Sequence, residues 1–484
     1  MLLVAYFLET LRKQRNTMNN VQMIFGAPGC GKTTHLIHIL ENLLKENTPD
    51  RIAFVSFTKK GSYEGRNRAM SVFNFKEADF PFFRTIHSIA FRELGMSRYD
   101  MMSKKNYKEF STAMGMSFVG YYTEDFINND DKYLFYESLV KNNPKAAECF
   151  SQDLDFRLVN RVNKNFSRYK EFAGVKDFDD LILDFIKEGK ALPVDVAIID
   201  EAQDLTSLQW KFCEVAFKEC RRVYIAGDDD QALYEWSGAD VDYFLGLTAS
   251  SSVTVLDRSY RLRRNMLNYS KTLSSVIKNR VDKVFEPVDE GGKISYHESL
   301  SEIAINSEES YYLLSRNNYF LTKYKTHLMK LGVPFLYKGK SSVDSVLSKA
   351  IVRYERCRKE GDIAAMEKDL VLKELLHKDR NLSRPWYEVF NLPIEELNYY
   401  RDLFKNKVDP DNLKITVSTV HGVKGGEADN VVMLMDITKN TNSNLQKNID
   451  SELRCLYVGV TRAKKNLHIV HSKSKFGYED LIKI

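Results

Sequence analysis

The stretch with the most specific chemistry is residues 21–34, which read VQMIFGAPGCGKTT. From Gly26 to Thr33 it matches the phosphate-loop pattern, in which small residues let consecutive backbone N–H groups turn toward phosphate oxygens. In that pattern Lys32 reaches the β- and γ-phosphates and Thr33 offers its hydroxyl to Mg²⁺. An ordinary glycine-rich turn is the alternative, but strand, loop and Gly-Lys-Thr follow in the order that nucleotide binding needs. The residues expected to contact the nucleotide are Gly26, Ala27, Pro28, Gly29, Cys30, Gly31, Lys32, Thr33 and Thr34.

A second candidate site lies in residues 196–210, which read VAIIDEAQDLTSLQW and begin as a buried strand. The strand delivers Asp200 and Glu201 to its carboxyl end, where α/β sheets place their ligands. Asp200 can hold Mg²⁺, commonly through water, because this ion keeps part of its hydration shell. Glu201 can orient or deprotonate an attacking water. An acidic pair alone is common, but behind a phosphate loop we interpret it as catalytic.

The elements that must position these residues are β-like apolar runs separated by helical and polar segments. This alternation predicts an α/β fold with parallel sheets. The clearest runs are residues 21–25, 52–56, 196–200, 223–227, 311–315, 415–419, 431–435 and 467–470. Two helical, charged stretches interrupt the alternation, at about 89–176 and 340–413. We interpret both as insertions carried by two α/β cores.

Length and composition limit the classes of protein. A chain of 484 residues is too long for one core. Its 43% hydrophobic and 28% charged residues are typical of a soluble globular protein. The net charge is only +5, so binding of nucleic acid would need locally clustered charge. Six cysteines without metal-ligand or disulfide spacing fit a reducing cytoplasm. Residues 1–8 lack the length of a membrane span and the basic front end of a signal peptide.

Four further segments of the N-terminal half resemble motifs of superfamily 1 helicases of the UvrD/Rep/PcrA group. Residues 56–60 (SFTKK) resemble the family's TFTNKA segment, and residues 84–88 (RTIHS) resemble its TFHS segment. Residues 177–181 (DFDDL) resemble the stretch that precedes the acidic strand. Residues 227–239 (GDDDQALYEWSGA) resemble GDDDQSIYRWRGA.

The C-terminal half continues the resemblance in the same order. Residues 256–261 (LDRSYR) are similar to LxxNYRS, and residues 420–427 (VHGVKGGE) are similar to LHSAKGLE. Residues 456–463 (LYVGVTRA) are similar to AYVGITRA. With the phosphate loop and the DEAQD segment, these motifs cover nearly the whole chain, in an order that chance does not explain.

The resemblance implies two RecA-like parallel-sheet cores of the P-loop NTPase class, with ATP in the cleft between them. Gln231 would contact the γ-phosphate or its attacking water. Arg261 and Arg462 would come from the second core and close onto the phosphates as arginine fingers. Tyr260 resembles the aromatic that stacks on adenine, and Glu427 the carboxylate that meets the ribose. Taken alone, Arg261 would be interpreted as a surface salt bridge.

The resemblance also implies a surface that binds single-stranded DNA. Aromatic residues match base-stacking positions, histidines match strand-contacting positions, and basic residues could bind backbone phosphates. The expected DNA-binding residues are Phe57, Lys59, Arg84, His87, Tyr234, Trp236 and His421. The alternative for Tyr234 and Trp236 is that they are ordinary core aromatics. Basic residues of the first insertion are interpreted as a solvated helical face.

The expected domain organisation places both helical stretches inside the two cores. The first core is expected at 1–88 and 177–258, with its insertion at 89–176. The second core is expected at 259–339 and 414–484, with a shorter insertion at 340–413. The family's glutamine-bearing adenine motif is missing ahead of Val21, so strict preference for ATP is not predicted. Ser237, Gly422 and Gly426 also depart from the family pattern.

The resemblance implies an ATP- and Mg²⁺-dependent DNA helicase of compact size, of the sort that phages encode, moving 3′-to-5′. Its expected partners are single-stranded DNA and single-strand/duplex junctions in the cytoplasm, with no membrane. Replication or repair proteins are candidate partners that the residues do not identify. The alternatives are a DNA-stimulated clamp or remodeller that does not unwind, and an RNA helicase.

Cys30 carries a separate prediction. It lies in the phosphate loop near Lys32 and a helix N-terminus, and both features lower the pKa of a thiol. We therefore expect a reactive thiol whose modification blocks ATP hydrolysis. The alternative is a small, buried and inert side chain.

Overall fold

The computed structural model describes residues 18–56, 66–67, 69–71, 75–122, 128–151, 154–306, 308–378, 381–405, 409 and 413–479. Contacts divide the chain into two compact units. Unit 1 comprises Met1–Leu262 and Ser274–Val288, and unit 2 comprises Arg263–Leu273 and Asp289–Ile484. No helix in the described ranges is both long and apolar enough to cross a membrane.

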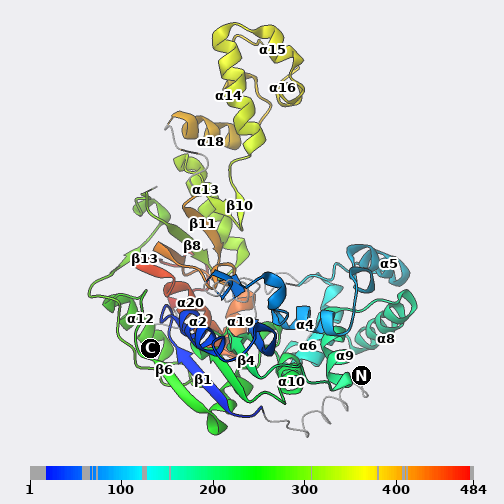
Figure 1. Ribbon diagram of the computed structural model, residues 1–484. Coiled ribbons are helices and arrows are strands. Elements are labelled where there is room, and N and C mark those ends of the chain that lie inside the picture. The colour runs from blue at the N-terminus through cyan, green and yellow to red at the C-terminus, as the bar shows by residue number, and fades with distance from the viewer. Residues whose placement is uncertain are drawn as a thin grey trace. The chain divides into compact units, whose positions relative to one another are not determined.

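Unit 1 contains a six-stranded parallel sheet with the order β3-β2-β4-β5-β1-β6. Figure 1 labels β1, β4 and β6 of this sheet. The order brings the ends of β4, β5 and β1 next to one another, which matters because the candidate site residues follow these strands. The strands are β1 (Val21–Gly26), β2 (Ile52–Ser56), β3 (Phe83–Arg84), β4 (Val196–Asp200), β5 (Arg222–Gly227) and β6 (Ser252–Leu256).

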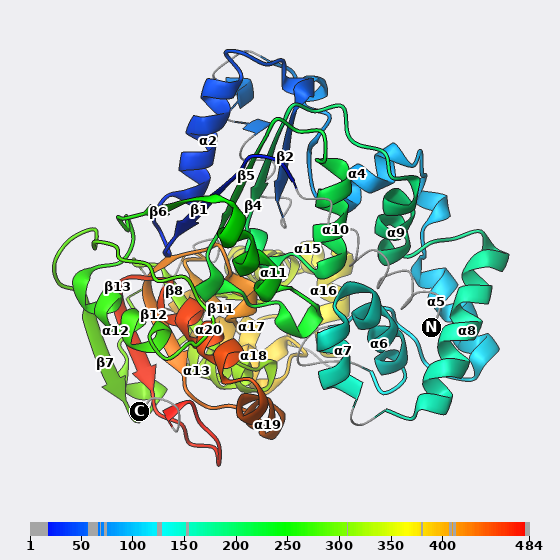
Figure 2. The same ribbon diagram turned by 90° about the horizontal axis from the view of Figure 1, so that it is seen from below.

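Both faces of this sheet are covered, and its central strands carry buried apolar side chains on both sides. In β4, Ala197 and Ile199 join a core with α4 (Ile86–Glu93), α9 (Phe178–Glu188) and α10 (Ser207–Ala216). Val196 and Ile198 point the other way, into a core with α2 (Lys32–Leu43). Alternate side chains of a strand face opposite sides, so helices lie on both sides of the strands (Figure 2). The α/β fold with a parallel sheet that the apolar runs predicted is confirmed.

A helical part of unit 1 has its own apolar cluster. The described residues between α4 and α9 form helices and carry buried aromatic side chains such as Phe110, Phe135 and Phe166. These helices are α5 (Lys104–Met114), α6 (Asp131–Asn142), α7 (Pro144–Phe150) and α8 (Phe156–Ala173); α11 (Val241–Gly246) follows later in the chain.

Unit 2 contains a seven-stranded sheet with the order β10-β9-β11-β8-β12-β13-β7. It is parallel except for the short β10–β9 pair. One face packs on α13 (Leu321–Leu331), whose Leu321, Tyr324 and Leu328 join the core. The strands are β7 (Lys293–His297), β8 (Tyr311–Ser315), β9 (Leu336–Tyr337), β10 (Lys340–Ser341), β11 (Ile415–Thr419), β12 (Ala428–Leu434) and β13 (Ala463–Val470).

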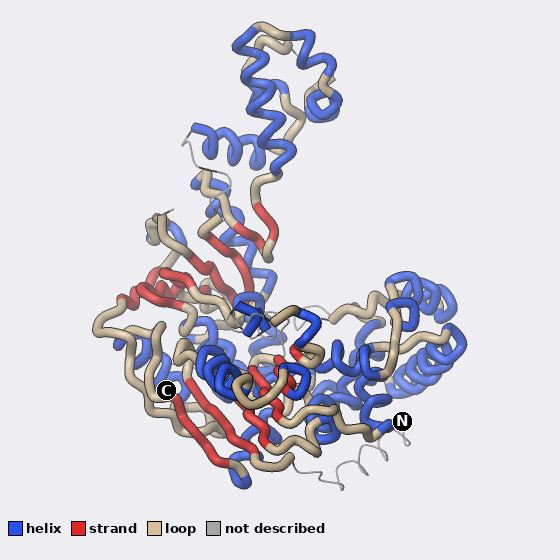
Figure 3. Tube along the Cα trace, in the orientation of Figure 1, coloured by secondary structure: helices blue, strands red, loops and turns tan. Residues whose placement is uncertain are grey.

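The remaining helices of unit 2 include a cluster with a hydrophobic core of its own. Tyr354, Trp386 and Tyr400 are buried in that core, and Figure 1 shows α14, α15, α16 and α18 set apart from the strands of unit 2, which Figure 3 draws in red. The cluster contains α14 (Ser345–Glu360), α15 (Ile363–Lys368), α16 (Leu370–Leu375), α17 (Trp386–Val389) and α18 (Ile394–Lys405). The others are α12 (Arg264–Ser274), α19 (Lys439–Lys447) and α20 (Ile449–Val460).

Candidate ATP-hydrolysis site

The phosphate loop joins the end of β1 to the start of α2 and is shaped by its glycines. Gly29 and Gly31 have φ angles of 73° and 76°, in the left-handed region that glycine adopts without strain. Gly31 precedes α2, and no side chain caps the helix there. The N–H groups of the first turn and the positive end of the helix dipole are therefore directed at the loop, as in phosphate sites.

Neighbouring side chains leave no room for larger residues in this loop. A Cβ atom on Gly26 would lie 2.2 Å from Cys30 Sγ, and one on Gly29 would lie 2.3 Å from Arg261 Cβ. Lys32 folds back across the loop, and its Nζ donates to the Gly26 carbonyl oxygen at 2.7 Å. The loop thus combines small residues with a cation held over them, which fits a polyphosphate.

The acidic end of β4 lies beside the start of α2. Thr33 Oγ1 donates to Asp200 Oδ2 at 3.1 Å. Asp200 is 2% exposed, and burial together with the charge of Glu201 raises its pKa to about 7. A hydroxyl and a carboxylate so placed fit Mg²⁺, which proteins hold with one or two ligands beside substrate phosphates. When bound, the ion would neutralise phosphate charge at this point.

Glu201 is held in an unusual backbone conformation. Its φ angle is 53°, in the left-handed region that residues other than glycine seldom adopt. Its N–H donates to Asp200 Oδ1 at 2.9 Å, and its Oε2 accepts from Gln203 Nε2 at 2.6 Å. Such conformations persist where surrounding structure enforces them and are concentrated at active sites. The carboxylate is therefore fixed in place, as a base that positions water must be.

Gln203 connects Glu201 to the acidic turn that follows β5. Gln203 Oε1 accepts from the Asp228 N–H at 3.0 Å, and Asp228 Oδ2 accepts from Gln231 Nε2 at 2.6 Å. All three residues of this connection are buried. The structure therefore brings the side chains expected for hydrolysis to the carboxyl edge of β1, β4 and β5; they are Lys32, Thr33, Asp200, Glu201 and Gln231.

Charges around the loop favour an ionised lysine. Burial alone would lower the pKa of Lys32, but Cys30, Asp228, Glu201 and Asp200 raise it above its ordinary value. The side chain therefore stays a cation at neutral pH, which is the state that binds phosphate.

Cys30 differs from its prediction. It is 5% exposed, and burial raises the pKa of its thiol although Lys32 pulls in the opposite direction. The prediction of a lowered pKa is wrong, because removal from water outweighs the nearby cation. A thiol of this kind is inert, so Cys30 serves the loop as a small residue packed against Gly26.

The part of the sequence that contains β1, the phosphate loop and the acidic end of β4 also matches the model of a known family. Residues 9–251, half of the chain, match the family model of the UvrD/REP helicase N-terminal domain. The chain belongs to the UvrD/Rep helicase family. Residues 414–470 match the UvrD-like helicase C-terminal domain. The resemblance seen in the sequence motifs is thereby confirmed.

The curated relatives of this UvrD/Rep chain are longer proteins. The chain is 25% identical over 307 residues to the ATP-dependent DNA helicase PcrA of Staphylococcus epidermidis, covering 58% of this chain and 41% of the relative. It is 24% identical over 310 residues to PcrA of Staphylococcus aureus, with the same coverage. The chain therefore spans less than half the length of these relatives.

Two solved structures show only weak likeness. The helicase nonstructural protein 10 of an arterivirus has a TM-score of 0.35 and 11% identity, over 94% of this chain and 60% of that one. The PRRSV helicase has a TM-score of 0.33 and 11% identity, over 98% and 55%. Values this low add nothing to the family assignment.

In this UvrD/Rep chain the Tyr260–Arg261 motif lies with unit 1. Ser259 Oγ donates to the Pro28 carbonyl oxygen at 2.8 Å, and the Tyr260 N–H donates to the Gly29 carbonyl oxygen at 2.8 Å. Because of these bonds, residues 259–262 are grouped with unit 1, whereas the second core was expected to begin at residue 259. Arg261 therefore lies beside the phosphate loop and is grouped with unit 1 by its contacts. Its expected place in the second core and its role as an arginine finger stay predictions.

Tyr260 has the exposure that a nucleobase platform needs. Its side chain is 66% exposed, and a Cβ atom on Gly31 would lie 3.9 Å from its ring. The Arg258 guanidinium lies 5.6 Å from the ring centroid. Stacking of adenine on Tyr260 stays a prediction, now with a ring placed next to the loop.

The remaining predicted nucleotide contacts lie in unit 2. Arg462 donates from Nε to the Val458 carbonyl oxygen at 2.9 Å and from Nη1 to the Gly426 carbonyl oxygen at 3.2 Å. Glu427 is exposed, with its Oε1 3.8 Å from Lys464 Nζ. Their roles as arginine finger and ribose contact stay predictions.

The predicted DNA-binding residues are described in part. Phe57 and Lys59 lie outside the described residues. Arg84 donates from Nε to the Pro81 carbonyl oxygen at 3.0 Å, and His421 is half-buried in a 3₁₀ turn of unit 2. Burial lowers the pKa of His87 to about 4. His87 is therefore neutral at pH 7, so it could contact a strand as a hydrogen-bonding group but not as a cation.

Tyr234 and Trp236 are both half-buried in unit 1. The Trp236 ring lies 6.0 Å from the ring of Phe135 in α6 and packs at the edge of the helical cluster. Burial raises the pKa of Tyr234. Trp236 thus has one packed side, which is closer to the core alternative than a free platform, and base stacking on it stays a prediction.

Trp236→Ala tests this stacking role. The variant should lose about 1–3 kcal/mol of binding to single-stranded DNA, and DNA stimulation of ATP hydrolysis should fall, whereas ATPase activity without DNA should survive. Titration of a labelled oligonucleotide beside both ATPase rates measures this. Phe135→Leu is the matched control, because it alters the packed side and leaves the indole. A stable Trp236→Ala variant with unchanged DNA affinity and stimulation would rule the role out.

The sequence motifs did not predict two basic residues that contact the acidic turn after β5. Lys283 and Arg280, about 50 residues beyond the acidic turn, form ion pairs with its aspartates. No motif marks these basic residues. The three successive aspartates could have indicated that basic residues lie nearby, because adjacent carboxylates after a buried strand favour a neighbouring cation.

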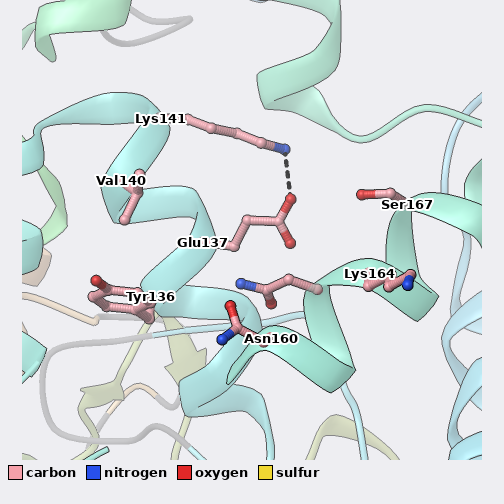
Figure 4. Close-up of a pocket in the computed structure, with 8 residues that line it drawn as sticks. Tyr136, Glu137, Val140, Lys141, Asn160, Lys164 and Ser167 are labelled. Carbon is pink, nitrogen blue, oxygen red and sulfur yellow. Dashed lines mark ion pairs between the residues drawn. The ribbon is translucent and has the colours of Figure 1, made fainter. Parts of the chain in front are cut away.

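A cavity of about 330 Å³ lies between α6 and α8, apart from the hydrolysis site. Lys141 Nζ, at its edge, lies 3.3 Å from Glu137 Oε1 (Figure 4) and 3.3 Å from Asp180 Oδ1. The charge of Lys141 is therefore already paired. Its lining residues are Tyr136, Glu137, Val140, Lys141, Asn160, Asn163, Lys164 and Ser167.

Proposed function

We propose that this chain is an ATP-driven translocase on single-stranded DNA that unwinds duplex DNA. The observation that carries the proposal is the assembly of Lys32, Thr33, Asp200, Glu201 and Gln231 at one sheet edge. This set can bind a nucleoside triphosphate with Mg²⁺, fix a base beside it, and place an amide near the γ-phosphate. Membership of the UvrD/Rep helicase family and the likeness to PcrA proteins support DNA as the substrate.

The path from the hydrolysis site to DNA is short in this proposal. Gln231 lies in the 3₁₀ turn Asp229–Gln231, and Trp236 lies in the next turn, Glu235–Ser237. A change at the γ-phosphate would therefore reach a stacked base through five residues of backbone. Movement in the 3′-to-5′ direction is part of the proposal and rests on the family resemblance.

Strand displacement on tailed duplexes tests the function. The purified chain is mixed with ATP, Mg²⁺ and duplexes that carry a 3′ single-stranded tail, a 5′ tail or no tail, and the released strand is measured. We expect release from the 3′-tailed duplex and ATP hydrolysis that rises with added single-stranded DNA. The same duplex with an RNA loading strand compares the two sugars.

The alternatives give different results in the same experiment. DNA-stimulated hydrolysis without release from any duplex would indicate a clamp or remodeller. Release only from the 5′-tailed duplex would contradict the polarity, and release only with the RNA strand would indicate an RNA helicase. Absence of ATP hydrolysis with and without DNA would overturn the proposal as a whole.

A further inference from the structure

Three successive aspartates follow β5 and are withdrawn from water. The side chains of Asp228 and Asp229 are fully buried, and that of Asp230 is 1% exposed. Burying one carboxylate without a partner is costly, and adjacent like charges raise the cost. Cations placed beside the three carboxylates would therefore stabilise the buried turn.

The cations come from the irregular segment Ser274–Val288. Lys283 is fully buried; its Nζ lies 3.1 Å from Asp228 Oδ1 and 3.0 Å from Asp230 Oδ2, and it also contacts Asp229 Oδ1. Arg280 donates to both carboxylate oxygens of Asp230, from Nε at 2.9 Å and from Nη2 at 2.9 Å. One lysine and one arginine thus balance most of the charge of three aspartates.

The same segment also binds the turn through its backbone. The Val281 N–H donates to Asp229 Oδ2 at 2.8 Å, so Asp229 is held on both oxygens. Contacts assign Ser274–Val288 to unit 1, although the chain on either side belongs to unit 2. The segment therefore contacts the acidic turn through two basic side chains and one backbone N–H group.

Asp228 connects Lys283 to the hydrolysis site through hydrogen bonds. Lys283 holds its Oδ1, and its Oδ2 accepts from Gln231 Nε2 at 2.6 Å. Its backbone N–H donates to Gln203, which donates to Glu201 Oε2 at 2.6 Å. Gln231 and Glu201 are thus connected to Lys283 by one and two intermediate residues, all of them buried or half-buried in unit 1.

We propose that Lys283, assisted by Arg280, is a positioning residue for ATP hydrolysis, which sets Gln231 and Glu201 through the carboxylate and backbone of Asp228. Neither basic side chain touches the phosphate loop in these contacts, so their effect is on geometry. Removal of the cation would let Asp228 turn away from its neighbours, and Gln231 would lose its fixed acceptor. The inference rests on the proposed hydrolysis of ATP but not on unwinding.

The test uses a charge-matched variant, because Lys283→Met alone would leave three buried carboxylates and could unfold the chain. In Lys283→Met/Asp229→Asn one carboxylate is removed together with the lysine. The side chain of Asp229 bonds to Lys283 and to the Val281 N–H, whereas the amide of Gln231 bonds to Asp228. Arg280→Gln and Arg280→Lys give a graded second series at a side chain that is 15% exposed. Asp282→Asn is the control, because Asp282 lies in the same segment, is 90% exposed and contacts Arg280 only from the solvent side, at 3.5 Å from Nη1. An exposed pair of this kind contributes little.

Steady-state ATP hydrolysis without DNA, nucleotide affinity and the melting temperature are measured for the full chain. We expect kcat to fall about 10- to 100-fold in Lys283→Met/Asp229→Asn, with KM and nucleotide affinity within about twofold of the wild-type values. Arg280→Gln should show a smaller fall, Arg280→Lys should restore part of it, and Asp282→Asn should have wild-type activity.

A double-mutant comparison separates positioning from general destabilisation. If Lys283 acts through Gln231 and Glu201, adding Lys283→Met/Asp229→Asn to Gln231→Ala or to Glu201→Gln should reduce kcat by a much smaller factor than it does in the wild-type chain. Losses that multiply, or wild-type kcat in a folded Lys283 variant, would overturn the inference. If that variant does not fold, wild-type kcat in Arg280→Gln would do so. A wild-type chain that hydrolyses no ATP would instead contradict the proposed function.

Discussion

Glu201→Gln should bind ATP about as well as the wild-type chain but hydrolyse it about 10²- to 10⁴-fold more slowly. Glutamine has nearly the same shape, and its oxygen can still accept the hydrogen bond from Gln203 Nε2. It cannot accept a proton, so the water would lack its base. The unusual φ angle of residue 201 is a backbone property and should persist in the variant.

Turnover with and without DNA and titration of a fluorescent ATP analogue measure this separation of binding from chemistry. Glu219→Gln is the matched control, because Glu219 is an exposed carboxylate of the same unit. Turnover close to wild type in Glu201→Gln would remove Glu201 from the mechanism. Loss of nucleotide affinity together with turnover would indicate a binding role instead.

Lys32→Ala should lose both nucleotide affinity and turnover. Lys32 is the cation held over the phosphate loop through its bond to Gly26, and Asp200, Glu201 and Asp228 surround it. Removing one partner from a buried charge pair costs about 2–5 kcal/mol, which corresponds to at least about 30-fold in ATP affinity. Turnover should fall below detection, because the remaining charges around the phosphates would be negative.

The same nucleotide titration, beside a melting curve, checks this result. Lys45→Ala is the control, because Lys45 is an exposed lysine just after α2 and bonds to Asn42. A folded Lys32→Ala chain that binds and hydrolyses ATP normally would show that the loop does not hold the triphosphate. A chain that melts far below the wild type would show instead that Lys32 serves mainly to neutralise the acidic groups around it.

The central strands could be predicted from the sequence because they are mostly apolar and largely buried on both faces. The expected runs 52–56, 196–200, 311–315 and 415–419 agree with β2, β4, β8 and β11 to the residue. The edge strands β6 and β7 were missed, because their side chains are half-exposed or exposed and their sequences mix polar with apolar residues. The short β3, β9 and β10 have two residues each and leave no pattern.

The same distinction applies to the candidate site. Some of its contacts can be predicted from local motifs, and others join residues that are far apart in the sequence. Thr33 and Asp200 could be paired from motifs, because a strand order common to nucleotide-binding sheets brings them together. The pKa shift of Cys30 was predicted in the wrong direction because the burial of its thiol depends on packing that no motif states. Trp236 packs on Phe135, and Lys283 reaches Asp229 across 54 residues. Contacts of this range have no local spacing from which they could be predicted.

The discontinuity of unit 1 has a consequence for the order in which the protein is made. Asp229 leaves the ribosome 54 residues before the lysine that neutralises it. At synthesis rates of about 5–20 residues per second, Lys283 is added to the chain roughly 3 to 11 seconds after Asp229. During that interval the turn cannot be buried in its final form. If Lys283 positions Gln231 and Glu201 as proposed, the nascent N-terminal core would become able to hydrolyse ATP only after the first part of unit 2 has been translated.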